Sequence, residues 1–110
     1  MSDLPEGFVQ LKKIHDACTL LREGGRPVVV LYGFPFLSAG TEERMDLLLH
    51  PGTHSGYVTR LFFERAVVGR GANWTQHRVV DRPWWAPSWQ NVPESMNWPA
   101  MLCAHLRAVA

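Results

Sequence analysis

The sequence predicts one α+β domain over residues 1–110, with an N-terminal helix, an antiparallel meander of three to four strands, a long ordered loop and a C-terminal helix. The chain has the length of a single domain. Short apolar runs alternate with Gly and Pro turn signals, which is typical of a meander. All five tryptophans and three of the eight prolines lie in residues 74–98. A long ordered loop in a compact domain is usually functional.

The chain begins with a segment of helical periodicity, residues 4–15, where Phe8, Leu11 and Ile14 share one face. A single longer helix that includes Cys18 would keep this spacing. We favour a short helix followed by a hairpin, because the following residues up to position 32 read as strand, Gly-Gly turn and strand.

The middle of the chain holds two further apolar runs. Gly33, Pro35 and Gly40 predict a loop before them. Residues 45–50 form the second apolar run, which a Pro-Gly pair closes. Residues 57–68 form the third run, with a partial alternation of apolar residues that predicts a strand, and a Gly-Arg-Gly triplet ends it.

The chain ends in a segment that predicts a helix. Pro99 suits the first turn of a helix, where its missing N–H costs nothing. Asn97 is a suitable N-cap. The apolar face of this helix is supplied by Met101, Leu102, His105, Leu106 and Val109.

Composition excludes several classes of protein. The net charge is +1, with 46% apolar and 19% charged residues, so no strong field attracts nucleic acid or an anionic membrane. No apolar stretch is long enough to span a bilayer, and the N-terminus does not resemble a signal peptide. Two cysteines, Cys18 and Cys103, indicate free thiols in a reducing cytoplasm. We expect both to be small apolar residues in or near the core.

Five histidines raise the question of a metal site. His50 and His54 flank the Pro-Gly turn and could approach each other. Metal sites need three or four ligands at restrained spacing, and neither cysteine is near in the sequence. We therefore expect no metal and no cofactor, with His50 and His54 as solvated loop residues and His105 as a partly buried helical residue.

Candidate catalytic residues lie in the tryptophan-rich segment. A hydroxyl needs an adjacent base to become a nucleophile, and Thr75 is close to His77, whereas Ser88 and Ser95 are alternatives. Asp81 could orient His77 and raise its pKa. The competing interpretation is that the His77 imidazole hydrogen-bonds a loop carbonyl and fixes the segment.

The tryptophans also allow two interpretations. They cover one end of the meander, with each indole N–H hydrogen-bonded. Alternatively, Trp74, Trp84, Trp85 and Trp89 form a partner-binding surface, and an exposed face of indoles would favour self-association.

The order of several short motifs resembles a known family. Residues 28–35 read VVVLYGFP, residues 45–52 read MDLLLHPG, residues 59–64 read TRLFFE and residues 73–77 read NWTQH, before a closing helix that contains HL. This order is similar to the ubiquitin-conjugating-enzyme (UBC) superfamily, specifically its compact bacterial branch, prokaryotic family E. The resemblance covers residues 4–109.

The resemblance implies a fold and a pathway. It implies an N-terminal helix on a meander, with an active-site loop after the last strand. Bacterial members of this branch act with ubiquitin-like proteins and activating-type enzymes, in some cases in antiviral defence. The typical His-Pro-Asn motif is absent, since His50 and Pro51 are followed by Gly52, and no cysteine follows until Cys103. No residue therefore inherits the thioester-forming role.

Two functions follow from this departure. The protein could carry the modifier as an ester on Thr75, Ser88 or Ser95, with His77 as general base. Alternatively it binds the ubiquitin-like protein or the activating enzyme without catalysis, which we favour, so whether it is a transferase stays open.

Two other classes of function compete with these. One is a module whose tryptophan-rich loop binds a peptide or a carbohydrate, and the other is a small zinc protein. We expect a cytoplasmic protein with no nucleic-acid or membrane partner.

Overall fold

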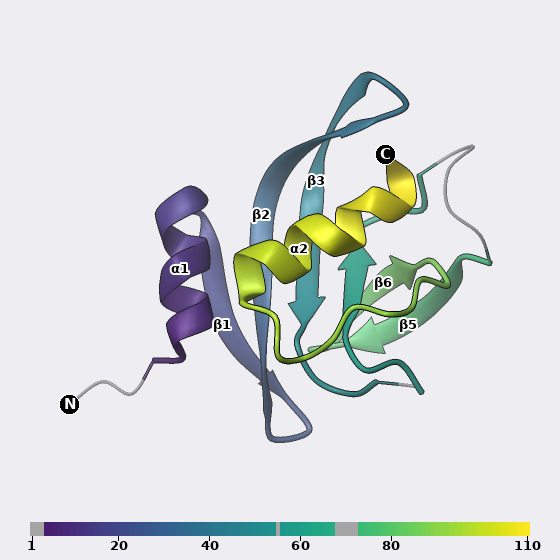
Figure 1. The fold of residues 1–110 in the computed structure, drawn as a ribbon. Coiled ribbons are helices and arrows are strands. Elements are labelled where there is room, and N and C mark those ends of the chain that lie inside the picture. The colour runs from purple at the N-terminus through teal and green to yellow at the C-terminus, as the bar shows by residue number, and fades with distance from the viewer. Residues whose placement is uncertain (1–3, 55, 68–72) are drawn as a thin grey trace.

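The computed structural model describes residues 4–54, 56–67 and 73–110. These residues form, in order, α1 (Glu6–Ile14), β1 (Cys18–Glu23), β2 (Arg26–Ser38), β3 (Thr41–His50), β4 (Arg60–Phe63), β5 (Thr75–Val79), β6 (Arg82–Ala86), α2 (Trp98–Leu106) and the 3-10 turn η1 (Arg107–Val109). The strands make one antiparallel sheet in the order β1-β2-β3-β4-β6-β5 (Figure 1). The α+β class with a helix near each end is confirmed, but the described residues form six strands where three to four were predicted.

The helix and hairpin that open the chain follow the favoured interpretation of the sequence. α1 ends at Ile14, and β1 and β2 meet at the predicted Gly-Gly turn, where both glycines adopt positive φ. Phe8 and Leu11 are buried as expected, whereas Ile14 is 58% exposed. A one-helix arrangement through residue 21 is therefore wrong.

The loop predicted from Gly33 to Gly40 is a continuation of β2. The pairing of β2 with β3 shifts between Leu31 and Phe34, and Gly33 accommodates this irregularity at φ +57°. The Gly33 N–H donates to Asp46 Oδ1 at 2.8 Å, which ties the irregularity to β3. Only the turn at Ala39 and Gly40 matches the predicted loop. Both residues adopt positive φ there, as this type of two-residue hairpin turn requires.

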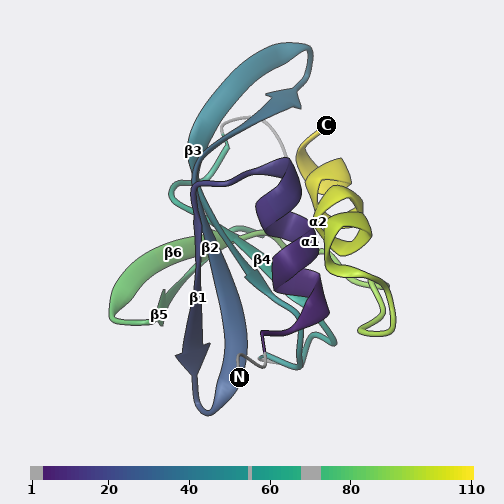
Figure 2. The ribbon, with the colours of Figure 1, turned by 90° about the vertical axis from the view of Figure 1, so that its left-hand side faces the viewer.

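The long loop predicted over residues 74–98 is wrong in its first half. Residues 75–86 form the hairpin β5–β6, and irregular structure is confined to the stretch between β6 and α2. This hairpin turns toward the face of the sheet opposite the helices (Figure 2). The end of the third apolar run, at the Gly-Arg-Gly triplet, lies outside the described residues.

The sheet is buried on both faces, with a separate core on each. The helix-side core packs α1 and α2 on the sheet and includes Leu47, Phe63 and Met101. The hairpin-side core includes Val30, Phe62 and the fully buried Trp84. All four residues of β4 are buried, because its alternate side chains enter opposite cores, and this explains why its sequence lacks a clean alternation.

The C-terminal helix begins as the sequence predicts. The Asn97 side chain accepts a hydrogen bond from Ala100 N at 2.8 Å, with Pro99 in the first turn. The helices pack closely where Gly7 faces Trp98: a Cβ built at Gly7 would overlap the indole. Within the described part of the chain, neither helix is long and apolar enough to cross a bilayer.

Candidate functional site

A group of polar side chains occupies one end of the hairpin-side core. We call it the polar cluster: His50, His54, Arg60, Thr75 and His77. Thr75, His77 and the buried Val79 are every second residue of β5, so all three side chains point to the same face of the sheet. Arg60 and Phe62 are likewise two residues apart on β4 and share that face. His50 is the last residue of β3. Strand register therefore brings together residues that are far apart in the sequence.

Arg60 is the most unusual member of the polar cluster. It is only 4% exposed, and it forms no ion pair with any residue in 4–54, 56–67 or 73–110. Its guanidinium lies 4.0 Å from the centre of the Tyr57 ring and 5.7 Å from that of Phe62. Burial lowers its pKa. Aromatic faces stabilise a cation less than a carboxylate does, so a buried and unpaired arginine is costly.

Thr75 and His77 form the hydroxyl–imidazole pair that the sequence made conceivable. Thr75 Oγ1 lies 2.8 Å from His77 Nε2, and Arg60 Nη2 donates to the same oxygen at 3.5 Å. Since Arg60 supplies a hydrogen to this oxygen, the Thr75 hydrogen is free to point at His77 Nε2. Thr75 is exposed and His77 is half-buried.

The predicted partnership of His77 with Asp81 is not what the structure contains. The described residues show no hydrogen bond or ion pair between them, and Asp81 lies in the β5–β6 turn, where its carbonyl accepts from Arg78. Burial and then the nearby Arg60 charge lower the pKa of His77, opposite to the expected direction. The His77 ring packs edge-on against His54 and Phe62 and bonds a hydroxyl rather than a loop carbonyl.

The prediction that His50 and His54 are solvated loop residues is wrong for His50, which ends β3 in a buried position, whereas His54 lies in the loop and is half-buried. His50 is 2% exposed, and its Nδ1–H donates to the Gly52 carbonyl at 3.0 Å. The two imidazoles do approach each other, with ring centres 5.1 Å apart. Burial lowers the pKa of both. The rings meet edge to face, and no set of three or more His, Cys, Asp or Glu residues within the described ranges could hold a metal ion.

The tryptophans divide between core and half-buried positions. Trp84 is fully buried and donates from Nε1 to the Val79 carbonyl at 3.1 Å, so its assignment to a partner-binding surface is wrong. Trp74, Trp85 and Trp89 are half-buried. Trp74 packs on Phe63, and Trp89 Nε1 donates to the Ala104 carbonyl of α2 at 3.1 Å. Trp84 therefore cannot contribute to self-association through an exposed face of indoles.

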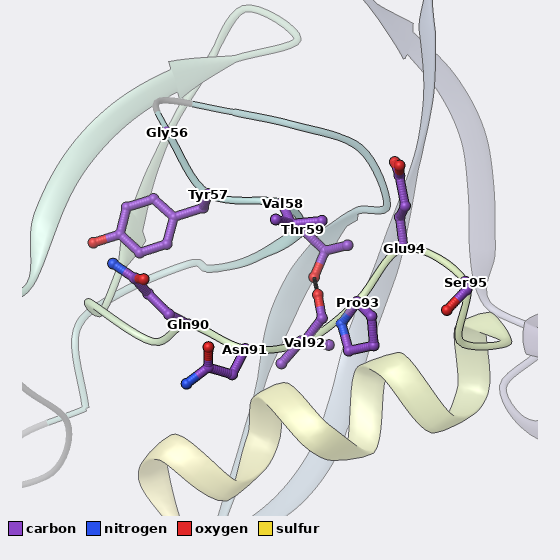
Figure 3. Close-up of a pocket in the computed structure, with 10 residues that line it drawn as sticks. All are labelled: Gly56, Tyr57, Val58, Thr59, Gln90, Asn91, Val92, Pro93, Glu94 and Ser95. Carbon is purple, nitrogen blue, oxygen red and sulfur yellow. Dashed lines mark hydrogen bonds between the residues drawn. The ribbon is translucent and has the colours of Figure 1, made fainter.

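A second candidate site is an open groove of about 510 Å³ between residues 56–59 and residues 90–95. Figure 3 shows Tyr57 and Gln90 at one end of this groove and Glu94 and Ser95 at the other. Glu94 is the one charged residue among those that line it. Ser88, the third hydroxyl candidate, is half-buried and does not line the groove.

The floor of the groove is fixed by a buried hydrogen-bond chain. Thr59 Oγ1 donates to the Val92 carbonyl at 2.8 Å (Figure 3). Because the only hydroxyl hydrogen is used there, His105 must donate from Nε2 to Thr59 Oγ1, also at 2.8 Å. His105 is 3% exposed, and burial lowers its pKa to about 4. The groove therefore rests on a rigid connection between the two loops and α2.

The cysteines have different environments. Cys18 is buried, as expected, and burial raises the pKa of its thiol, which suppresses thiolate chemistry. Cys103 is exposed, so its predicted place in or near the core is wrong. Both thiols are free, and neither cysteine lines the groove or contacts the polar cluster among the described residues.

Sequence reasoning missed Arg60 and Tyr57. The signal that could have found Arg60 is a cation inside an otherwise apolar strand, since it immediately precedes Leu61, Phe62 and Phe63.

Comparisons of the chain with protein-family models, curated proteins and solved structures found no match.

Proposed function

We propose that this chain is a UBC-like component of a bacterial ubiquitin-like conjugation pathway, which binds the ubiquitin-like protein or its activating-type enzyme and carries no thioester. The resemblance in motif order from the Gly-Phe-Pro turn to the closing helix supports this proposal. The arrangement of a helix, an antiparallel sheet and a closing helix is compatible with it.

The observation that carries the proposal is the groove between residues 56–59 and 90–95. Six of its ten lining residues come from the segment in which the sequence predicts partner contacts, and apart from Tyr57 its walls are loop backbone and small or medium side chains. Such a groove suits an extended segment of a partner protein, whose main chain can hydrogen-bond to loop backbone. The buried Thr59–His105 connection holds both walls in place before binding, which reduces the entropy that association costs.

The placement of the thiols supports binding without a thioester. A thioester-forming cysteine must be accessible and close to the bound partner. Cys18 is buried, and Cys103 does not line the groove.

A second candidate function is that of a general peptide-binding module. The groove favours a peptide over a carbohydrate, because none of the five tryptophans lines it and Trp84 is enclosed in the core. Sugar sites commonly present an exposed aromatic face, which the groove offers only in Tyr57.

The proposal predicts that genes beside the gene of this protein encode a ubiquitin-like protein and an activating-type enzyme. The test is calorimetric binding of the purified protein to both of these gene products. Val58 lines the groove and is 51% exposed, so Val58→Asp should leave the fold intact and weaken binding at least tenfold, by roughly the 1.4 kcal/mol that a tenfold change requires.

The matched control is Leu37→Asp. Leu37 is also exposed, at 64%, but it lies beside the β2–β3 turn, at the end of this hairpin that is away from His50. This variant should bind like the unmodified protein. Absence of binding to either partner would refute the proposal, and a peptide that binds and is lost in Val58→Asp would then favour the second candidate.

A further inference from the structure

The least explained feature of the molecule is the buried Arg60 beside an exposed hydroxyl. We propose that Thr75 is an acyl-accepting nucleophile, with His77 as its general base and Arg60 as the cation that faces the developing oxyanion. The donor would be a carboxyl group activated as a thioester. This inference rests on the proposed function, because an activating-type enzyme delivers its modifier in that chemical form.

The geometry of Thr75 and His77 suits proton abstraction. A general base must lie within hydrogen-bond reach of the proton that it takes, and 2.8 Å separates His77 Nε2 from Thr75 Oγ1. With Arg60 as a donor to Oγ1, the Thr75 hydrogen is free to point at Nε2 in the tautomer whose Nε2 accepts. Edge-on packing against Phe62 and His54 fixes the imidazole plane. Burial lowers the pKa of the imidazole and so favours its neutral form, which is the form that can accept a proton.

Arg60 places a buried positive charge beside Thr75 Oγ1, where it would stabilise a developing oxyanion. The nucleophilic oxygen lies 3.5 Å from Arg60 Nη2. The oxyanion would form two bonds from that oxygen, on the attacked carbonyl carbon, and would lie in the same neighbourhood. Because Arg60 is only 4% exposed and has no carboxylate partner in the described ranges, solvent screens its charge weakly and no counter-charge neutralises it. Stacking on Tyr57 fixes the plane of the guanidinium.

The two serine alternatives lack these partners. Among the described residues, no hydrogen bond joins Ser88 or Ser95 to a histidine or an arginine. Ser95 is exposed at the end of the groove and Ser88 is half-buried. An unassisted hydroxyl is a weak nucleophile at neutral pH, so the structure distinguishes Thr75 from both.

The proposed step balances without a redox partner. Thr75 Oγ1 bonds to the thioester carbonyl carbon while its proton passes to His77 Nε2. The tetrahedral oxyanion then collapses, the C–S bond breaks, and the departing thiolate takes the proton from His77. The products are an ester on Thr75 and a free thiol.

The test uses a small donor, the 2-mercaptoethanesulfonate thioester of N-acetylglycine, with the full chain. Cys103→Ala serves as the background, because an exposed thiol would exchange with the donor. Intact mass and peptide mapping should locate one acyl group on Thr75, which hydroxylamine removes and thiol reductant does not. Amides on lysine or the N-terminus resist hydroxylamine and are thereby excluded.

The variants separate chemistry from folding. Thr75→Ala should abolish the ester and Thr75→Ser should retain it. His77→Gln should slow acylation roughly a hundredfold and remove the histidine ionisation from its pH profile. Arg60→Met should slow it by a similar factor, roughly a hundredfold. Thr19→Ala, at an exposed hydroxyl on β1, and His15→Ala are matched controls that should acylate at the unmodified rate, and near-ultraviolet circular dichroism checks that each variant is folded.

Two outcomes would overturn the inference: acylation of Thr75→Ala at an undiminished rate, or an ester located on Ser88 or Ser95. Binding of the ubiquitin-like protein or its activating enzyme is measured in parallel. Retained binding without a Thr75 ester would refute this inference and leave the proposed function intact. A Thr75 ester without binding to either partner would refute the proposed function, while the inference that Thr75 accepts an acyl group would stand.

Discussion

The two faces of the sheet are closed in different ways. On the helix side, α1 and α2 cover an almost wholly apolar surface, in which Phe63 packs on Phe36 and Trp74. On the hairpin side, β5–β6 covers an apolar core at Trp84, but the same surface ends in the polar cluster around Arg60. Phe63 and Arg60 belong to the same four-residue strand.

This difference separates stability from the proposed activity within one strand. The helix side gains free energy from burying apolar surface. The polar cluster instead holds a buried cation, and His54 Nδ1 and Arg60 Nε have no hydrogen-bond partner among the described residues. Unsatisfied buried polar atoms lower the free energy of unfolding. Such a cost persists in a domain where the groups serve a function.

The largest expected effect is on the helix side. Phe63→Ala removes a fully buried ring, so the free energy of unfolding should fall by about 3–5 kcal/mol. Urea denaturation followed by tryptophan fluorescence measures the change. A loss below about 1 kcal/mol would mean that the helix-side core repacks freely and that the contrast between the faces is smaller than argued.

Acid should destabilise the protein through buried histidines. The unfolded chain binds a proton at His105 with an ordinary pKa of 6.5, whereas burial lowers the folded pKa to about 4. Stability present above pH 6.5 is therefore lost as the pH falls toward 4, by about 3 kcal/mol from this residue alone. His50, His54 and His77 shift in the same direction and add to the loss.

Urea denaturation at pH 7 and at pH 4.5 measures this decline. His105→Gln, whose amide can still donate to Thr59, should show a shallower decline than the unmodified protein. An equally steep decline in this variant would exclude His105 as its source.

The packing of the two helices should be sensitive to a single methyl group. Gly7→Ala would overlap the Trp98 indole and should destabilise the protein by about 1–3 kcal/mol. The control is Val9→Ala on the same helix, since Val9 is 39% exposed and should cost far less. Thermal unfolding compares the two. Equal melting temperatures would show that α1 is free to move away from α2.

The smallest effect concerns the start of α2. Asn97→Ala removes the acceptor for Ala100 N and should cost about 1 kcal/mol. Hydrogen exchange of the first-turn amides should accelerate, while exchange on the hairpin side stays unchanged. Acceleration on both faces would indicate that the two cores are not separable.

The sequence predicted those elements whose signals are local. The Asn97 cap with Pro99 marks the start of α2, and the Gly-Gly pair marks the β1–β2 turn. The β5–β6 hairpin was missed because its turn is formed by Val80 and Asp81 at positive φ, where Gly or Asn is expected. Pro83 within β6 also argues against a strand.

The candidate site was predicted only in part for the same reason. Once residues 75–79 are a strand, Thr75 and His77 must share a face, and this pair could be anticipated. Arg60 reaches them through the pairing of β4 with β6 and of β6 with β5. That long-range register carries no local signal. The apolar run after Arg60 could single out the cation, but neither its contact with Thr75 nor the edge-on histidines could be predicted from spacing.

The most direct test is to measure unfolding and acylation together in Arg60→Met, which replaces the buried cation by an apolar side chain. We predict an unfolding free energy that is unchanged or higher by up to about 4 kcal/mol, because an unpaired buried charge is removed. We predict a strongly reduced rate of Thr75 acylation in the same sample. A variant that loses stability while it keeps its acylation rate would contradict this, since Arg60 would then be a structural residue of the hairpin-side core.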